Sequence, residues 1–126
     1  RGVAHVAKHG AWGRDIYADY LARARELASG TWVVQTFTDA RNRAAMASPR
    51  IDEVVGMRFP DGSEYKSGSD HSKWAASLEV EGLVFVGDLN RTTGQLARGG
   101  GGLVLRSPAL WRFLRANATS VTSAEH

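Results

Sequence analysis

The order in which helix and strand patterns alternate is the feature of this sequence that most restricts its fold. Residues 14–28 repeat apolar side chains at three- and four-residue spacings, as an amphipathic helix does. Residues 31–38 are rich in β-branched and aromatic side chains, which favour a strand, and residues 39–47 predict a short helix that ends before Pro49. This alternation predicts an α/β or α+β fold in which helices flank a β-sheet.

The middle of the chain is predicted to be rich in strands. Strand patterns cover residues 54–59, 71–77 and 83–87, and we expect the last two to pair with each other. Residues 60–63 combine proline, aspartate and glycine and predict a tight turn. The four glycines at 99–102 have two interpretations, a flexible turn between strands or a loop whose backbone approaches a phosphate.

The C-terminal part of the chain predicts one more strand and one more helix. Residues 103–105 suit a short strand, and Ser107 followed by Pro108 is typical of a helix start. The tail from Ala116 onward is small and polar and is expected to fray. Because the sequence shows neither an internal repeat nor a linker, we expect residues 1–126 to form a single domain.

The composition narrows the possible partners and chemistry. The 126 residues carry a formal net charge of +3, which suits a polyanionic partner. Cysteine is absent, so disulfides, thiolate chemistry and a cysteine-based zinc site are excluded. No apolar run approaches the ~20 residues that cross a bilayer, so no membrane partner is predicted.

The candidate chemistry lies in the run Asp70-His71-Ser72-Lys73-Trp74 and in Asn90, which follows His71 by 19 positions. On an extended segment, side chains two apart share a face, so His71 and Lys73 are expected to project together. An imidazole can attack or protonate, and an ammonium or an amide can hold a phosphate. Each candidate also has an ordinary structural explanation. His71 and Lys73 could be a surface pair on an edge strand, and Asn90 could be a turn residue.

Four further residues are candidates for contact with DNA or phosphate: Trp74, Arg91, Arg98 and Gly100. Each has an ordinary structural alternative, which is core packing for the tryptophan, an exposed charge for either arginine and a flexible turn for the glycine. We predict neither a cofactor nor a metal. His5 and His9 have a spacing that suits metal binding on a helix, but no third ligand lies nearby in the sequence.

Taken together, these segments resemble the C-terminal half of deoxyribonuclease II, a family similar to the phospholipase D superfamily. The order of the matching segments is kept over nearly the whole chain. The resemblance is carried by Ala7-Lys8, residues 13–21, Asp70-His71-Ser72-Lys73-Trp74, Val86-Gly87-Asp88-Leu89-Asn90-Arg91, Gln95, Arg98-Gly99-Gly100-Gly101 and Pro108-Ala109-Leu110-Trp111.

The resemblance implies an α/β, phospholipase D-like half with a mixed β-sheet flanked by helices. It also implies an endodeoxyribonuclease that works at acidic pH without a metal and leaves 3′-phosphate ends through a phosphohistidine. His71 would then be a nucleophile or an acid/base, and Lys73 and Asn90 would hold phosphoryl oxygens. Two other functions remain open at this point: a catalytically inactive DNA-binding module, and a phospholipase D-like phosphodiesterase that acts on lipid or RNA.

Two departures from the family pattern shape the expected partners. The first His-x-Lys motif is absent, so the resemblance implies an N-terminal half of the same protein that carries it, or otherwise a second copy of this chain. The animal enzymes have cysteines at the positions of Ala75, Phe85 and Val104, and their absence predicts a bacterial member. The sequence assigns no compartment, although an exported or periplasmic one would fit a bacterial protein.

Overall fold

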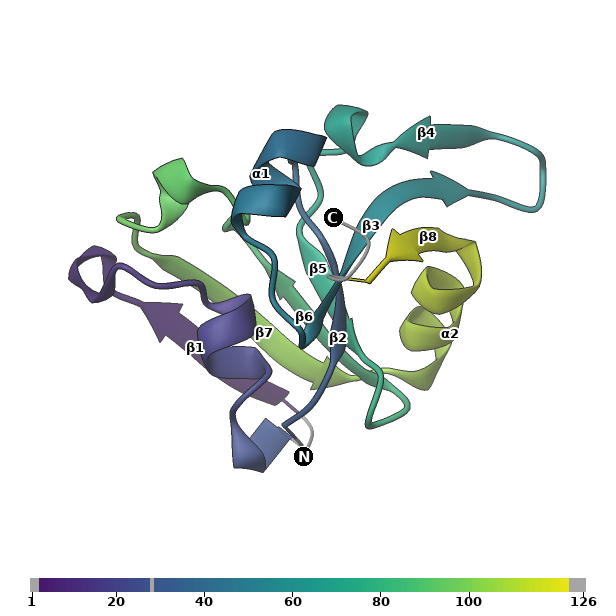
Figure 1. Ribbon diagram of the computed structural model, residues 1–126. Coiled ribbons are helices and arrows are strands. Elements are labelled where there is room, and N and C mark those ends of the chain that lie inside the picture. Colours follow the sequence, from purple (N-terminus) through teal and green to yellow (C-terminus); the bar gives the residue numbers. More distant parts are fainter. Residues whose placement is uncertain (1–2, 28, 123–126) are drawn as a thin grey trace.

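An eight-stranded mixed β-sheet forms the centre of the computed structural model, which describes residues 3–27 and 29–122 (Figure 1). Strands follow the order β1-β7-β6-β5-β2-β3-β4, and β8 also pairs with β3. Among the described pairs, β2 and β3 run parallel and the others antiparallel. The strands are β1 (Val3–Lys8), β2 (Trp32–Gln35), β3 (Ile51–Arg58), β4 (Glu64–Lys66), β5 (Trp74–Ser77), β6 (Leu83–Gly87), β7 (Gly100–Arg106) and β8 (Ala118–Val121).

Helices and short helical turns cover parts of both faces of the sheet. Figure 1 shows α2 beside β8, at the side of the sheet opposite β1. In the described part of the chain, none of the helices has the length and apolar character that crossing a membrane requires. The helical segments are α1 (Ala40–Ala45), α2 (Pro108–Asn117), the π turn η2 (Tyr17–Leu21) and the 3₁₀ turns η1 (Gly10–Trp12), η3 (Arg25–Leu27), η4 (Ser67–Ser69) and η5 (Thr93–Gln95).

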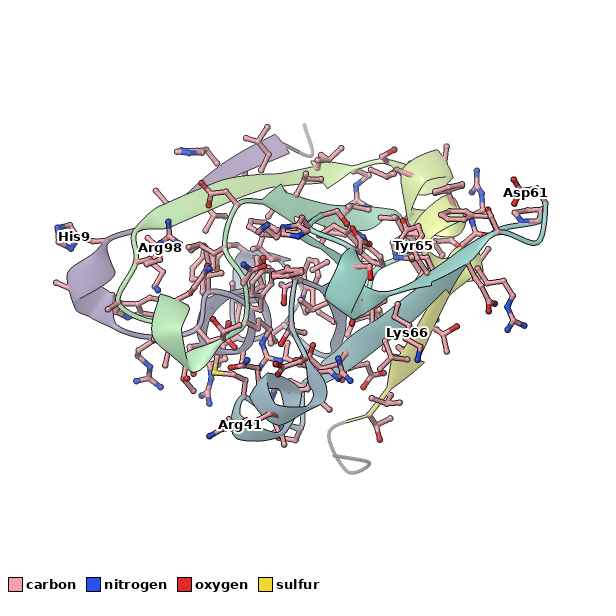
Figure 2. The ribbon with its side chains drawn as sticks, turned by 90° about the horizontal axis from the view of Figure 1, so that it is seen from above. His9, Arg41, Asp61, Tyr65, Lys66 and Arg98 are labelled. Atoms are coloured by element: carbon pink, nitrogen blue, oxygen red, sulfur yellow. The ribbon has the colours of Figure 1, made fainter. Side chains whose placement is uncertain are left out.

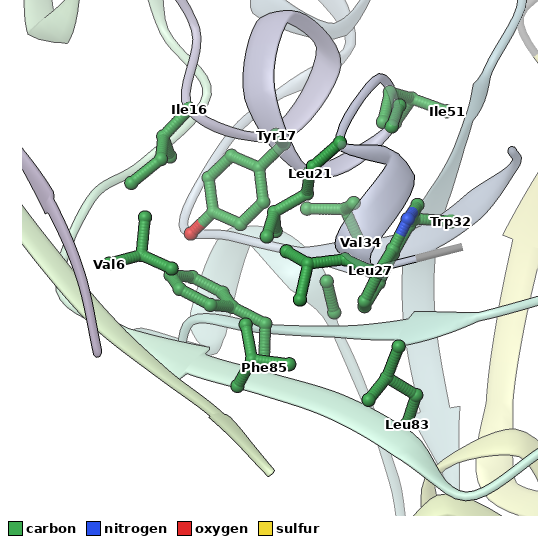
Figure 3. Packing of buried hydrophobic residues seen from close by; sticks show 14 of the residues in the cluster. Val6, Ile16, Tyr17, Leu21, Leu27, Trp32, Val34, Ile51, Leu83 and Phe85 are labelled. Atoms are coloured by element: carbon green, nitrogen blue, oxygen red, sulfur yellow. The ribbon is translucent and has the colours of Figure 1, made fainter. Parts of the chain in front are cut away.

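The sheet separates two apolar clusters because side chains alternate between its faces. On β2, Trp32 packs into the cluster beneath η2 and η3, whereas Val33 packs into the cluster beneath α2. Figure 3 shows the first cluster, in which the ring of Tyr17 meets Phe85 edge-on with ring centroids 5.6 Å apart. Leu114 of α2 belongs to the second cluster. The sheet is thus held from both sides, as an α/β fold requires.

The predicted helix at 14–28 is wrong as a continuous helix, and residue 28 lies outside the described residues. The structure has a π turn and a 3₁₀ turn instead. Asp15 accepts a hydrogen bond from the N–H of Tyr17 and pairs with Arg91, so tertiary contacts fix the start of the turn. The apolar spacing correctly indicated the buried face, because Tyr17 and Leu21 are fully buried.

The glycine run and the tail also differ from expectation. Gly100 to Gly102 are not a turn but the first residues of β7, paired with β1. A Cβ on Gly102 would lie 2.1 Å from the carbonyl oxygen of Val86, so the glycine lets the strands approach closely. The tail does not fray at Ala116, because residues 118–121 pair with β3 as β8. Residues 123–126 of the predicted tail lie outside the described residues.

Other expected elements are confirmed near their predicted bounds. The helix predicted at 39–47 is α1, and the strand predicted at 83–87 is β6. The Ser107 hydroxyl accepts a hydrogen bond from the N–H of Leu110 and caps α2, as the sequence indicated. β1 and β4 were not predicted.

Candidate active site

His71 and Lys73 lie in a loop that leads into β5 rather than on the strand itself. β5 begins at Trp74, which pairs with Gln35 at the end of β2, so the predicted strand start at residue 71 is wrong. The N–H of Ser72 donates to the carboxylate of Asp70 over 2.9 Å, which bends the loop. The Lys73 Nζ donates to the carbonyl oxygen of His71 over 2.6 Å, and the ammonium therefore stays beside the histidine.

The imidazole of His71 stacks on the ring of Phe37. The ring centroids are 3.8 Å apart and the planes differ by 19°. Both side chains are exposed, with 36% of Phe37 accessible to solvent. Phe37 lies two residues beyond the end of β2, the strand that pairs with β5. The stack therefore joins the ends of two neighbouring strands and holds an accessible imidazole at the surface.

Asn90 reaches the same place from the other side of Phe37. Its Oδ1 accepts a hydrogen bond from the backbone N–H of Phe37 over 2.8 Å. A backbone N–H can only donate, so the amide oxygen faces Phe37 and the NH₂ group is directed elsewhere. Among the described residues, none accepts a hydrogen bond from the Asn90 Nδ2. The structure thus brings Asn90 and His71 together, because both side chains contact Phe37.

A surface pocket of about 540 Å³ opens beside the His71 loop. It lies between that loop, the end of β6 and α2. His71 and Lys73 line it together with apolar side chains, so an anionic group bound beside them could have an apolar neighbour in the pocket. The lining residues are His71, Ser72, Lys73, Trp74, Val86, Gly87, Asp88, Leu110 and Leu114.

The backbone around Asn90 is braced by buried hydrogen bonds. The hydroxyl of Tyr17 donates to the carbonyl oxygen of Leu89 over 2.6 Å, and burial raises the pKa of this tyrosine, so it remains a donor. The N–H of Asn90 donates to the Gln95 side chain over 2.9 Å. Lys8 in turn donates to the carbonyl oxygens of Gln95 and Leu96. Each contact restricts the position from which the Asn90 side chain projects.

Arg91 is buried and does not present its guanidinium to solvent. Only 1% of its side chain is exposed, and it pairs with the carboxylates of Asp15 and Glu53. It also donates to the carbonyl oxygen of Met46. The prediction that Arg91 contacts DNA is therefore wrong for this structure, because its guanidinium is buried and already bound to two carboxyl groups. Its place next to Asn90 makes it an anchor of the site loop.

Burial raises the pKa of Glu53 to about 7, and the nearby carboxylate of Asp15 adds to the rise, although Arg91 acts in the opposite direction. The Glu53 Oε2 is buried without a hydrogen-bond partner in the described structure. Burial thus favours the protonated, neutral form of Glu53 beneath the site loop.

The other three candidate contacts lie in different surroundings. Trp74 is 6% exposed and packs in the cluster beneath α2, although it also lines the pocket. Arg98 is exposed, and Figure 2 shows it toward the end of the molecule marked by His9, away from the turn at Asp61. Gly100 lies in β7, where a Cβ would meet the carboxylate of Asp88 at 2.5 Å. Contact of these three with DNA stays a prediction.

No three His, Asp or Glu side chains gather as a possible metal site within residues 3–27 and 29–122. His5 and His9 do not share a helix face. His5 lies on β1, and the His9 Nδ1 accepts a hydrogen bond from the N–H of Ala11 at the start of η1.

Sequence reasoning missed the segment that connects the two motif loops. The Gln35 side-chain NH₂ donates to the carbonyl oxygen of Asp70 over 3.1 Å, and the Thr36 hydroxyl accepts from the N–H of Arg91 over 3.2 Å. Phe37 completes the run. These residues belong to an ordinary strand pattern, and nothing in the sequence indicates their contacts with distant loops. The one sequence signal is Phe37 itself, an aromatic residue at the end of a predicted strand.

The site therefore offers an accessible imidazole, an adjacent ammonium and an amide donor. Positive groups and donors of this kind stabilise a phosphoryl group during transfer, and the imidazole can act as nucleophile or as acid and base. The second imidazole that such chemistry would use is not part of the site that the described residues form.

Comparison with known proteins identifies the family of this chain. The family model of deoxyribonuclease II matches residues 2–124. Cell-death-related nuclease 7 of Caenorhabditis elegans is 36% identical over 85% of this chain and 29% of its own length. Deoxyribonuclease-2-alpha of Rattus norvegicus is 33% identical over 87% of this chain and 32% of its own, and that of Sus scrofa is 32% identical over 86% and 30%.

The chain thus spans about a third of the length of these curated relatives. No solved structure matches it significantly. The family model covers nearly every residue, from β1 to the end of the described tail, and includes both motif loops. This chain therefore belongs to the deoxyribonuclease II family.

Proposed function

We propose that this chain supplies the second His-x-Lys motif of a metal-independent acid endodeoxyribonuclease that leaves 3′-phosphate ends. The observation that carries the proposal is the grouping of His71 and Asn90 around Phe37 in a member of the deoxyribonuclease II family. The relatives bear the names of nucleases and deoxyribonucleases, which supports DNA as the substrate. The chain would form the C-terminal half of a two-half, phospholipase D-like nuclease.

The proposed reaction uses two imidazoles in turn. A nitrogen of one histidine attacks phosphorus, the bond from phosphorus to the 5′ oxygen breaks, and the other histidine protonates that oxygen. The same second histidine then takes a proton from water, which attacks the phosphohistidine and releases the 3′-phosphate. His71 is one of the two, as nucleophile or as acid and base. Lys73 and Asn90 hold phosphoryl oxygens during both steps.

An acidic pH optimum for DNA cleavage follows from the different roles of the two histidines. One imidazole must be neutral to attack while the other is protonated to donate, and an unperturbed histidine changes charge near about pH 6.5. Protonated histidines on a basic surface also strengthen binding to phosphates.

The first His-x-Lys motif is proposed to come from an N-terminal half of the same protein. The relatives are about three times as long as this chain, which leaves room for such a half. A second copy of the chain is the alternative source, because a symmetric dimer would also bring two histidines together. In both arrangements the His71 loop must face the partner across the bound phosphate.

The test is cleavage of plasmid DNA in EDTA at about pH 5, with intact mass spectrometry on the same sample. Cleavage accompanied by a second polypeptide supports a two-half enzyme, and cleavage by this chain alone supports a homodimer. Cleavage that appears only when the N-terminal half is added identifies the chain as half a site. No cleavage in either case would favour a DNA-binding module, and cleavage of RNA or lipid esters in place of DNA would favour another phosphodiesterase.

A further inference from the structure

Phe37 contacts both motif loops, although it belongs to neither motif. Its ring stacks on His71 with centroids 3.8 Å apart, and its N–H donates to the Asn90 Oδ1 over 2.8 Å. The preceding residues contact the same loops, through the Gln35 amide to Asp70 and the Thr36 hydroxyl to Arg91. The short segment 35–37, at the end of β2, therefore contacts both parts of the site.

The ring of Phe37 is not part of the hydrophobic core. It is absent from both apolar clusters of the described residues, and 36% of the side chain is exposed. An exposed phenyl ring gains little from burial, so its contact with the imidazole is its main described interaction. The planes differ by 19°, and a near-parallel stack restricts rotation of the His71 ring about its last side-chain bond.

The backbone of Phe37 acts on the second side chain independently of the ring. Because its N–H requires an acceptor, the Asn90 amide is held with the oxygen toward Phe37 and the NH₂ group away from it. That NH₂ group is the part of the amide that can donate a hydrogen bond to a phosphoryl oxygen. Rotating the amide by half a turn would place two donors against each other, so this orientation is strongly preferred.

We propose that Phe37 is the positioning residue of the site, holding the His71 plane through its ring and the Asn90 donor through its N–H. The role rests on the proposed function, because it is the proposed phosphoryl chemistry that needs both groups aligned before substrate arrives. Alignment of this kind raises the rate of the chemical step and leaves substrate affinity largely unchanged.

The ring contribution is tested with Phe37→Leu and Phe37→Tyr in the complete gene product. Leucine removes the stack and keeps the backbone N–H, whereas tyrosine keeps an aromatic ring. Phe113→Leu is the matched control, because Phe113 is an exposed phenylalanine on α2. Should Phe37→Leu fail to fold, Phe37→Met removes the ring equally well.

The first readout is proton NMR of the His71 ring, assigned by the loss of its signals in His71→Ala. Ring currents shift protons that lie over an aromatic face, so Phe37→Leu should move the His71 signals toward their random-coil positions, and Phe37→Tyr should leave them shifted. Unchanged His71 signals in Phe37→Leu would overturn the inference. This readout does not depend on activity.

The second readout is the kinetics of DNA cleavage. We expect Phe37→Leu to lower kcat about three- to tenfold with KM nearly unchanged, and Phe37→Tyr and Phe113→Leu to stay close to wild type. An equal kcat in Phe37→Leu and wild type would also overturn the inference. Failure of the proposed function looks different: His71→Ala would then cleave DNA normally, while the NMR comparison would still show whether the stack exists.

Discussion

Arg91 and Glu53 form an ion pair in which each side chain is only 1% exposed, although the residues lie 38 positions apart. Arg91 follows Asn90 directly, and Glu53 lies on β3. The pair therefore connects the site loop to that strand. Because Asp15 also binds Arg91, a single buried cation holds three segments together.

Replacing Arg91 by methionine should destabilise the fold strongly. Above pH 7, where Glu53 is ionised in the fold, the change leaves two buried carboxylates without their cation. Losing one partner of a buried pair costs about 3–5 kcal/mol in the free energy of unfolding. Urea denaturation measures the change. Arg58→Met is the control, because the side chains of Arg58 and Glu64 in that pair are 74% and 59% exposed, and we expect a change within about 0.5 kcal/mol. Equal losses in the two variants would contradict the anchoring role.

Stability should rise as the pH falls from 7 toward 4.5, and Glu53 should account for part of the rise. Its pKa in the fold is about 7, above the ordinary value of 4.5, so in this window the folded state binds a proton that the unfolded state lacks. The Glu53 contribution is therefore fully present below pH 4.5 and lost as the pH rises through 7.

Glu53→Gln should flatten this dependence. One proton contributes at most about 1.4 kcal/mol per pH unit, and the glutamine cannot bind it. Thermal melts of the wild type and the variant across this pH window measure how the stability of each changes with pH. Subtracting one curve from the other removes the contribution of the histidines, which both proteins share. Parallel curves for wild type and variant would show that Glu53 does not retain a proton in the fold.

Asn90→Asp should abolish most cleavage while the loop keeps its position. A carboxylate oxygen can still accept from the N–H of Phe37, but the NH₂ donor becomes a second negative oxygen beside the phosphate. We expect kcat/KM to fall at least about a hundredfold, as when a preorganised donor is removed. Asn42→Asp on α1 introduces the same charge change outside the site and should cleave normally. If the two variants cleave alike, Asn90 is not a phosphate donor.

Gly102→Ala should destabilise the sheet, whereas Gly94→Ala should not. A Cβ at residue 102 would lie 2.1 Å from the Val86 carbonyl oxygen, and overpacking of this kind costs about 1–3 kcal/mol. At residue 94 no atom lies within 4 Å of the added carbon. Urea denaturation of the two variants measures the difference, and a stable Gly102→Ala protein would mean that β6 and β7 can separate locally.

The sequence selected the candidate site residues without predicting the loop that carries them. His71, Lys73 and Asn90 were selected by spacing and resemblance, and the structure gathers His71 and Asn90 around Phe37. The reason given for pairing His71 with Lys73 was wrong, because the two residues lie in a loop and the contact runs from the ammonium to a backbone carbonyl.

The features that were mispredicted depend on distant contacts. Residues 14–28 have a helical period, but the Asp15–Arg91 pair joins segments 76 positions apart and reshapes the turn. The glycines of β7 indicate a turn locally, yet they are required by the close approach of β1 and β6. An arginine such as Arg91 is typical of an exposed surface in a sequence, and only the fold shows its two carboxylate partners.

The most direct measurement compares His71→Ala with His5→Ala in plasmid cleavage at about pH 5 in the presence of EDTA. Both variants remove one exposed histidine, and His5 lies on β1 outside the site. We predict that His71→Ala loses at least about a hundredfold in rate, as expected for a nucleophile or general acid, while His5→Ala cleaves as wild type. Full cleavage by His71→Ala would contradict the proposed site.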